Sequence, residues 1–127
     1  MEILVVDDSK LMREMVIASL RGLSGASFTQ AASGLEAIEK LSLSPFDLVF
    51  LDLNMPDLGG VEVVQFIREQ EGMQELPVVI VTTRGDDASR ARVLSAGATR
   101  FMTKPFDPEQ IVDVARALVS EEPGRDG

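Results

Sequence analysis

Three carboxylates follow two apolar runs of this sequence. Asp7 and Asp8 come directly after residues 3–6, and Asp52 comes directly after residues 48–51. A short apolar run that ends in polar or turn residues is typical of a buried strand. In an open parallel sheet, ligands bind at the carboxyl ends of the strands. The pattern therefore places these carboxylates where such a fold performs chemistry, although Asp52 alone would be interpreted as a turn residue.

Two other predicted strands end in groups that bind anions. Residues 78–81 are followed by the hydroxyl of Thr82, and residues 100–103 by the ammonium group of Lys104. Each side chain alone is common at a protein surface, but parallel strands bring all these ends to one edge. Clustered carboxylates repel one another unless a cation neutralises them, and Mg²⁺ prefers oxygen ligands. The set is suited to receive a phosphoryl group on a carboxylate, as an acyl phosphate.

Strands and helices are predicted to alternate five times, which indicates an α/β fold with a parallel sheet covered on both faces. Right-handed crossovers then favour a doubly wound topology. The predicted strands are residues 3–6, 27–32, 47–51, 78–81 and 100–103, and the predicted helices are residues 9–21, 33–44, 60–72, 87–96 and 107–118.

Apolar spacing predicts the buried face of three of these helices. In the first, Met12, Met15, Val16, Ser19 and Leu20 recur at helical spacing, and in the second Leu35, Ile38 and Leu41 are expected to form the buried stripe. The helix at residues 87–96 offers only a thin stripe of Ala88, Ala91, Val93 and Leu94. Small side chains bury little area, so we expect this helix to be held less firmly than the others.

The composition bounds the function further. The chain has 127 residues, enough for one domain, and a net charge of −9, which argues against nucleic acid as a direct partner. It has neither His nor Cys, which excludes His-based metal sites and thiol chemistry. No apolar stretch is long enough to span a membrane, and the acidic start is unlike a signal peptide. We expect a cytoplasmic protein without membrane association.

Four short motifs resemble those of one family. They are Val-Val-Asp-Asp-Ser at residues 5–9, Leu-Asp-Leu-Asn-Met-Pro at 51–56, Thr-Thr at 82–83 and Lys-Pro-Phe at 104–106. Over residues 2–119 the chain resembles the receiver domain of response regulators in two-component signalling, and is similar to the single-domain chemotaxis regulators. The resemblance implies a flavodoxin-like (βα)5 fold with strand order 2-1-3-4-5. It also implies a receiver domain at residues 1–120, followed by a flexible tail or linker stub at 121–127.

The same resemblance implies a role for each acidic residue. Asp52 would be the phosphoacceptor, in a reaction that depends on Mg²⁺, for which Mn²⁺ can substitute. The metal site would comprise Asp7, Asp8, Asp52 and the backbone carbonyl of Asn54. The protein would not be an enzyme, since it would catalyse only its own phosphotransfer and dephosphorylation.

Further roles carried by the resemblance concern the phosphoryl group and its readout. Thr82, Thr83 and Lys104 would bind the phosphoryl oxygens, and Thr82 with Phe101 would form the switch. Additional implied features are a phosphoryl lifetime tuned by Asn54 and Arg84, and a cis peptide bond before Pro105.

The implied partners are a sensor histidine kinase or phosphotransfer protein and a downstream target protein that the sequence does not identify. The output face would be formed by the helix at 87–96, the strand at 100–103 and the helix at 107–118. The protein would be a monomer or a phosphorylation-dependent dimer.

Three alternatives remain at this point. A Mg²⁺-dependent phosphatase with an aspartyl nucleophile would need an acid two residues after Asp52, where the chain has Asn54. A flavodoxin-like cofactor binder would need a phosphate-binding loop after the first strand, where Asp7 and Asp8 would repel phosphate. The chain would otherwise be the receiver half of a larger multidomain regulator.

Overall fold

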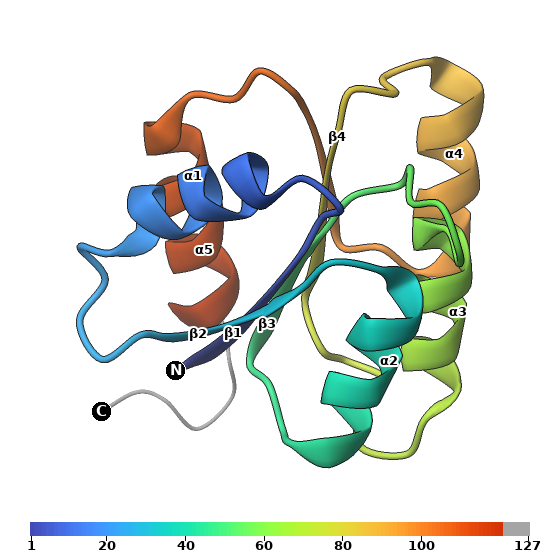
Figure 1. The fold of residues 1–127 in the computed structure, drawn as a ribbon, viewed down its shortest axis with the longest axis horizontal. Helices are drawn as coiled ribbons and strands as arrows, with labels where there is room; N and C mark the ends of the chain where they lie inside the picture. Colours follow the sequence, from blue (N-terminus) through green and yellow to red (C-terminus); the bar gives the residue numbers. More distant parts are fainter. Residues whose placement is uncertain (121–127) are drawn as a thin grey trace.

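Strands and helices alternate along the chain, as the sequence predicts (Figure 1). The structure is a computed structural model that describes residues 1–120, so the expectation of a tail at 121–127 lies outside the described residues. The strands are β1 (Glu2–Val6), β2 (Ser27–Ala31), β3 (Leu48–Leu51), β4 (Val78–Thr82) and β5 (Arg100–Thr103). The helices are α1 (Lys10–Leu20), α2 (Gly34–Leu43), α3 (Gly60–Glu69), α4 (Asp87–Ala96) and α5 (Pro108–Ser120).

The five strands are parallel and follow the order β2-β1-β3-β4-β5, which confirms the predicted doubly wound topology. The order reverses between β1 and β3, and such a reversal is where ligands bind in this class of sheet. Val6 lies opposite Leu51 in the register of these two strands. The next residue of each strand is an aspartate, so Asp7 and Asp52 leave the sheet side by side. The backbone N–H of Asp52 also donates to the carbonyl of Val6 at 3.0 Å.

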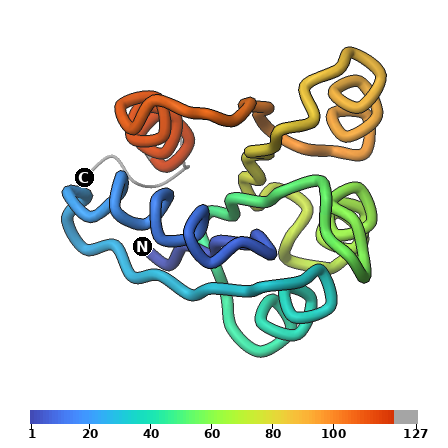
Figure 2. The backbone as a smooth tube through the Cα atoms, turned by 45° about the horizontal axis from the view of Figure 1, so that its top comes forward, coloured from blue at the N-terminus to red at the C-terminus, as the bar shows by residue number. Residues whose placement is uncertain are grey.

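Helices cover both faces of the sheet. In Figure 2, α1 and α5 lie on one face, and α2, α3 and α4 lie on the other. Successive strand residues point to opposite faces, so each strand contributes to both cores. Ile3, Val5 and Phe50 pack with α1 and α5, whereas Leu4, Val6 and Leu51 pack with the other three helices. This alternation explains why β1, β3 and β4 consist almost entirely of apolar residues.

The residues that α1 and α2 bury differ in part from their apolar spacing, and the predicted stripe of α2 was partly wrong. In α1 the buried residues are Val16, Ile17 and Leu20, while Met15 is largely exposed. In α2 they are Gly34, Ala37 and Leu41, while Leu35 is 61% exposed. A Cβ atom at residue 34 would overlap the backbone of Leu58, so glycine there lets the helix N-terminus approach the chain that follows β3. The face of α2 that packs inward is thus formed by Gly34, Ala37 and Leu41.

The helix α4 packs even less firmly than its sequence suggests. Val93 is its one fully buried residue, Leu94 is partly buried, and Ala88 and Ala91 are exposed. The expected stripe is therefore narrower than predicted, because the helix turns its alanines to solvent. No helix within residues 1–120 has both the length and the apolar character needed to cross a bilayer.

Candidate functional site: a carboxylate cluster at the strand ends

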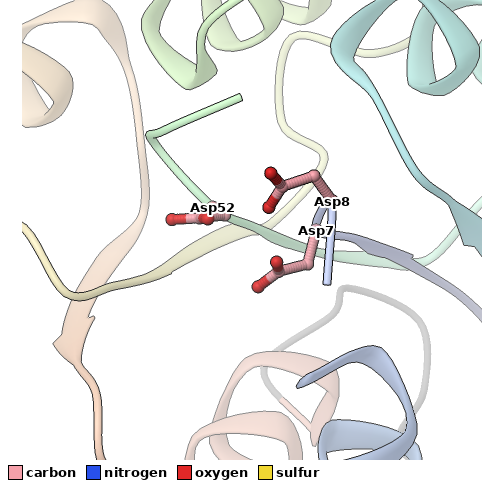
Figure 3. Close-up of side chains that lie close together, drawn as sticks. All are labelled: Asp7, Asp8 and Asp52. Carbon is pink, nitrogen blue, oxygen red and sulfur yellow. The ribbon is translucent and has the colours of Figure 1, made fainter. Parts of the chain in front are cut away.

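The carboxylates of Asp7, Asp8 and Asp52 lie together where β1 and β3 end (Figure 3). One oxygen of each lies within 4.8 Å of the others. Asp7 and Asp52 are each only 6% exposed, whereas Asp8 is open to solvent. Three carboxylate oxygens at this spacing, with one side open, suit a hard divalent cation such as Mg²⁺ or Mn²⁺. The residues therefore fit the metal that the sequence implies.

Lys104 reaches the cluster from the end of β5. Its Nζ lies 2.7 Å from Oδ2 of Asp7 and 3.6 Å from Oδ2 of Asp52. The Lys104 side chain is 11% exposed, so the ammonium group is largely withdrawn from water. Its backbone N–H donates to the carbonyl of Thr82 at 2.8 Å, and the Lys104–Pro105 peptide bond is cis. The cation therefore lies between two acids that would otherwise repel each other.

Thr82 is completely buried at the end of β4. Its Oγ1 accepts a hydrogen bond from the backbone N–H of Arg84 at 3.1 Å, and the hydroxyl lies near enough to Asp52 to favour the ionised carboxylate and lower its pKa. The adjacent Thr83 is exposed. Within residues 1–120 its side chain forms no hydrogen bond with any of the three carboxylates. Of the two threonines, Thr82 is thus the one that touches the cluster.

The pKa of Asp52 is raised, chiefly because burial disfavours the charged form. Lys104 is the strongest opposing influence, while the neighbouring charge of Asp7 raises the pKa further. The Thr82 hydroxyl and the Asn54 N–H also favour the ionised form. One cation for three acids leaves the cluster short of positive charge, and a second cation would keep Asp52 ionised.

Residues 3–116 match the family described as the response regulator receiver domain. The chain belongs to this family. It is 36% identical to the chemotaxis protein CheY1 of Helicobacter pylori over 110 residues, which cover 86% of this chain and 89% of CheY1. Receiver domains are signalling modules of two-component systems, and their general role depends on phosphorylation.

Solved receiver structures share the fold. The chemotaxis protein CheY4 of Vibrio cholerae superposes with a TM-score of 0.84 at 32% identity, covering 92% of this chain and 97% of CheY4. The receiver domain of the sensor histidine kinase PA1611 of Pseudomonas aeruginosa superposes with a TM-score of 0.85 at 27% identity, covering 94% and 97%. That domain has a magnesium ion coordinated in its active site cleft.

Asn54 and Arg84 form the rim of this receiver site. A guanidinium N–H of Arg84 donates to Oδ1 of Asn54 at 3.3 Å, which joins the loop after β3 to the loop after β4. The backbone N–H of Asn54 lies 3.4 Å from Oδ1 of Asp52. Both rim side chains are exposed. The hydrogen bond between them therefore links two exposed side chains of the loops that follow β3 and β4.

Phe101 lies on β5, on the face of the sheet that α2, α3 and α4 cover. It is partly buried, and the guanidinium carbon of Arg90 lies 5.6 Å from the centre of its ring. The structure thus places Phe101 against α4, away from direct contact with the carboxylates. Arg90 was not anticipated, because the sequence does not give the rotation of α4 about its axis.

Sequence reasoning also missed two residues that hold the backbone of the receiver site. Arg13, on α1, donates to the carbonyl of Asp7 at 2.7 Å and to the side chain of Gln30 at 2.8 Å. Asp57, in the loop after β3, accepts hydrogen bonds from the first turn of α2. Neither contact has a local sequence signal, because each depends on how two separate elements dock.

Proposed function

We propose that this receiver domain accepts a phosphoryl group on Asp52 from a phosphohistidine of a sensor histidine kinase or phosphotransfer protein. The observation that carries the proposal is the burial of Asp52 beside a second carboxylate, an ammonium group and a hydroxyl. Burial strengthens electrostatic interactions, so these groups act strongly on charge that develops at Asp52.

In the transfer step, a carboxylate oxygen of Asp52 attacks phosphorus and the P–N bond to the donor imidazole breaks. The electron pair of that bond stays on the imidazole nitrogen, and the product at Asp52 is an acyl phosphate. Lys104, Thr82 and Thr83 bind the phosphoryl oxygens. This chain contributes positioning and charge neutralisation, which are the main protein contributions to phosphoryl transfer.

The metal site would comprise Asp7, Asp8, Asp52 and the backbone carbonyl of Asn54, which would hold Mg²⁺ or, in its place, Mn²⁺. When bound, the metal neutralises negative charge on the transferred group and on the carboxylates. The spacing and burial of the three carboxylates support this assignment. Asp8 is the exposed member of the set, so it would be the ligand on the solvent side of the site.

The switch comprises Thr82 and Phe101. A phosphoryl group adds about −1.5 to −2 charges, and it favours whichever arrangement of Thr82 and Lys104 binds it best. Phe101 and Arg90 connect this change to α4, which is the most thinly packed helix of the described chain. The output face is formed by α4, β5 and α5, where a downstream protein or a second phosphorylated copy binds.

The bond between Arg84 and Asn54 tunes the lifetime of the acyl phosphate. Hydrolysis requires water to reach phosphorus from solvent, and both side chains are exposed on the two loops that follow Asp52 and Thr82. We therefore assign these two residues to the control of dephosphorylation rather than to the transfer step.

Incubation with a small-molecule phosphodonor and Mg²⁺, followed by intact-protein mass spectrometry, tests the proposal. We expect one phosphoryl adduct on the wild-type chain and none on Asp52→Asn or after chelation of the metal. Asp47→Asn is the matched control, because Asp47 accepts a hydrogen bond from the Glu2 N–H, at the opposite end of β1 from Asp7. An adduct that persists on Asp52→Asn would show that the acceptor is another residue.

A further inference from the structure

Asp57 connects the loop that follows Asp52 to a helix far away in the sequence. Its Oδ1 accepts a hydrogen bond from the backbone N–H of Gly34 at 3.2 Å, and its Oδ2 accepts one from Leu35 at 3.1 Å. These two amides open α2 and have no partner within the helix. The two carboxylate oxygens of Asp57 therefore bind two successive amides of the first helical turn.

The same helix has a separate local cap. Oγ of Ser33 accepts a hydrogen bond from the backbone N–H of Glu36 at 3.1 Å, and the Glu36 side chain binds the backbone N–H of Ala32 at 2.6 Å. The arrangement resembles a capping box, except that Glu36 binds the amide of Ala32, one residue before the N-cap Ser33. The N-terminus of α2 therefore already has a local cap without Asp57. The additional contact with Asp57 serves to attach the loop that carries Asp57 to this helix.

The loop is closely packed on both sides of Asp57. A Cβ atom at Gly34 would overlap the backbone oxygen and Cβ of Leu58, so α2 lies directly against the loop. On the other side, the Gly60 N–H donates to the carbonyl of Leu53 at 3.0 Å. A Cβ atom at Gly60 would overlap the backbone oxygen of Asp52. The loop therefore lies between the N-termini of α2 and α3, and Asp57 is its polar attachment to α2.

We infer that Asp57 is a positioning residue for two of the proposed metal ligands, Asp52 and Asn54. It attaches the loop of residues 53–59 to α2, and this loop directly follows Asp52 and carries Asn54. The inference rests on the proposed function, because it takes Asp52 and Asn54 as metal ligands. Removal of the attachment leaves the loop joined to the sheet at Asp52 but free to shift away from α2, which disperses the oxygens offered to the metal.

An aspartate suits this task better than other residues. Its carboxylate has two acceptor atoms for two neighbouring amides, and negative charge is favoured at a helix N-terminus. The amides of Leu58, Leu35 and Gly34 lower the pKa of Asp57 despite its exposure. Asparagine keeps one acceptor and no charge, so it should preserve only part of the attachment.

Mg²⁺ titration followed by amide chemical shifts in NMR tests the inference on the complete chain. We expect Asp57→Ala to raise the Mg²⁺ concentration at half-saturation by about tenfold, the lower end of the range for residues that orient metal ligands. Asp57→Asn should give a smaller shift in the same direction. Ser33→Ala is the matched control, because it weakens the start of α2 without touching the loop, and we expect it to leave half-saturation unchanged.

Each outcome separates the inference from the proposed function. An unchanged half-saturation in both Asp57 variants, or an equal shift in Ser33→Ala, would overturn the positioning role. A wild-type chain that binds Mg²⁺ but acquires no phosphoryl adduct would instead overturn the proposed function alone. Where Asp57→Ala does not fold, Asp57→Asn decides the question, since its shape is nearly that of the native residue. The phosphorylation rate should recover in Asp57→Ala at saturating Mg²⁺, which a general loss of structure would not allow.

Discussion

Lys104 is bound more closely to Asp7 than to Asp52. Its Nζ lies 2.7 Å from the Asp7 carboxylate and 3.6 Å from that of Asp52, although Lys104 and Asp7 are 97 residues apart in sequence. The short contact connects the residue that follows β5 with the residue that follows β1, at the edge of the sheet where the carboxylates lie. In the proposed cycle, Lys104 would exchange part of this contact with Asp7 for one with the phosphoryl group on Asp52.

The first prediction concerns the loss of this ammonium group. Lys104→Ala leaves two buried acids unpaired, so we expect the free energy of unfolding in the absence of metal to fall by about 3 kcal/mol. Urea unfolding followed by circular dichroism with a chelator present measures this value. Lys10→Ala removes the same charge from an exposed position on α1 and serves as the control. Equal stability of Lys104→Ala and the wild type would contradict the prediction.

The second prediction concerns pH. Because the pKa of Asp52 is raised in the folded protein, its ionised form opposes folding above that pKa, and the penalty disappears as pH falls toward the ordinary value of 3.8. Asp52→Asn should therefore be more stable than the wild type at neutral pH without metal. The gap should narrow in acid and also when Mg²⁺ stabilises the wild type. Unfolding curves at several pH values decide this, and a variant less stable at neutral pH would refute it.

The third prediction concerns Arg68 on α3. Its guanidinium donates to the carbonyls of Gly97 and Met73 at 2.9 and 3.1 Å and to Oγ1 of Thr99 at 3.4 Å. Burial lowers the Arg68 pKa, and the structure records no ion pair for it within residues 1–120. Arg68→Ala leaves three acceptors without this donor, so we expect a loss of about 2 kcal/mol in unfolding free energy.

Hydrogen exchange distinguishes this role from a general loss of packing. We expect amides in the last turn of α4 to exchange faster in Arg68→Ala, because Gly97 ends that helix. Arg92→Ala, an exposed arginine on α4 itself, is the control. Faster exchange spread evenly over all helices would argue against a local attachment.

Much of this architecture could be predicted from the sequence because it depends on local patterns. The apolar runs of β1 and β3, each ending in an aspartate, indicate both the parallel sheet and the position of the acids. The rotation of each helix about its axis could not be predicted, since Leu35 fits a helical stripe yet is exposed, while the neighbouring Gly34 packs against Leu58. The hydrogen bond between Arg13 and the Asp7 carbonyl could not be predicted either, because it depends on how α1 docks against the end of β1.

The fourth prediction concerns the rim of the site. Arg84→Ala removes the hydrogen bond to Asn54 and opens the solvent side of Asp52. We expect the acyl phosphate to hydrolyse about fivefold faster, which corresponds to one hydrogen bond worth roughly 1 kcal/mol. Loss of the adduct with time, after removal of the phosphodonor, measures the rate.

A double-mutant cycle shows whether the two rim residues act together. If the bond is responsible, Arg84→Ala combined with Asn54→Ala should hydrolyse no faster than either single variant. Additive effects would mean that the two side chains act separately. Arg116→Ala, on an exposed part of α5, controls for the general loss of positive charge.

The register of β1 and β3 has a consequence for how this protein can vary. Asp7 and Asp52 each lie one residue beyond a paired strand position, so the pairing of β1 with β3 fixes the relative positions of the two carboxylates. A single inserted or deleted residue in either strand would exchange its inward and outward side chains between the two cores and displace its acid at the same time. Insertions and deletions can accumulate in the loops far from the acids. Within β1 and β3, a change of length that displaces an acid also disrupts the packing of both cores.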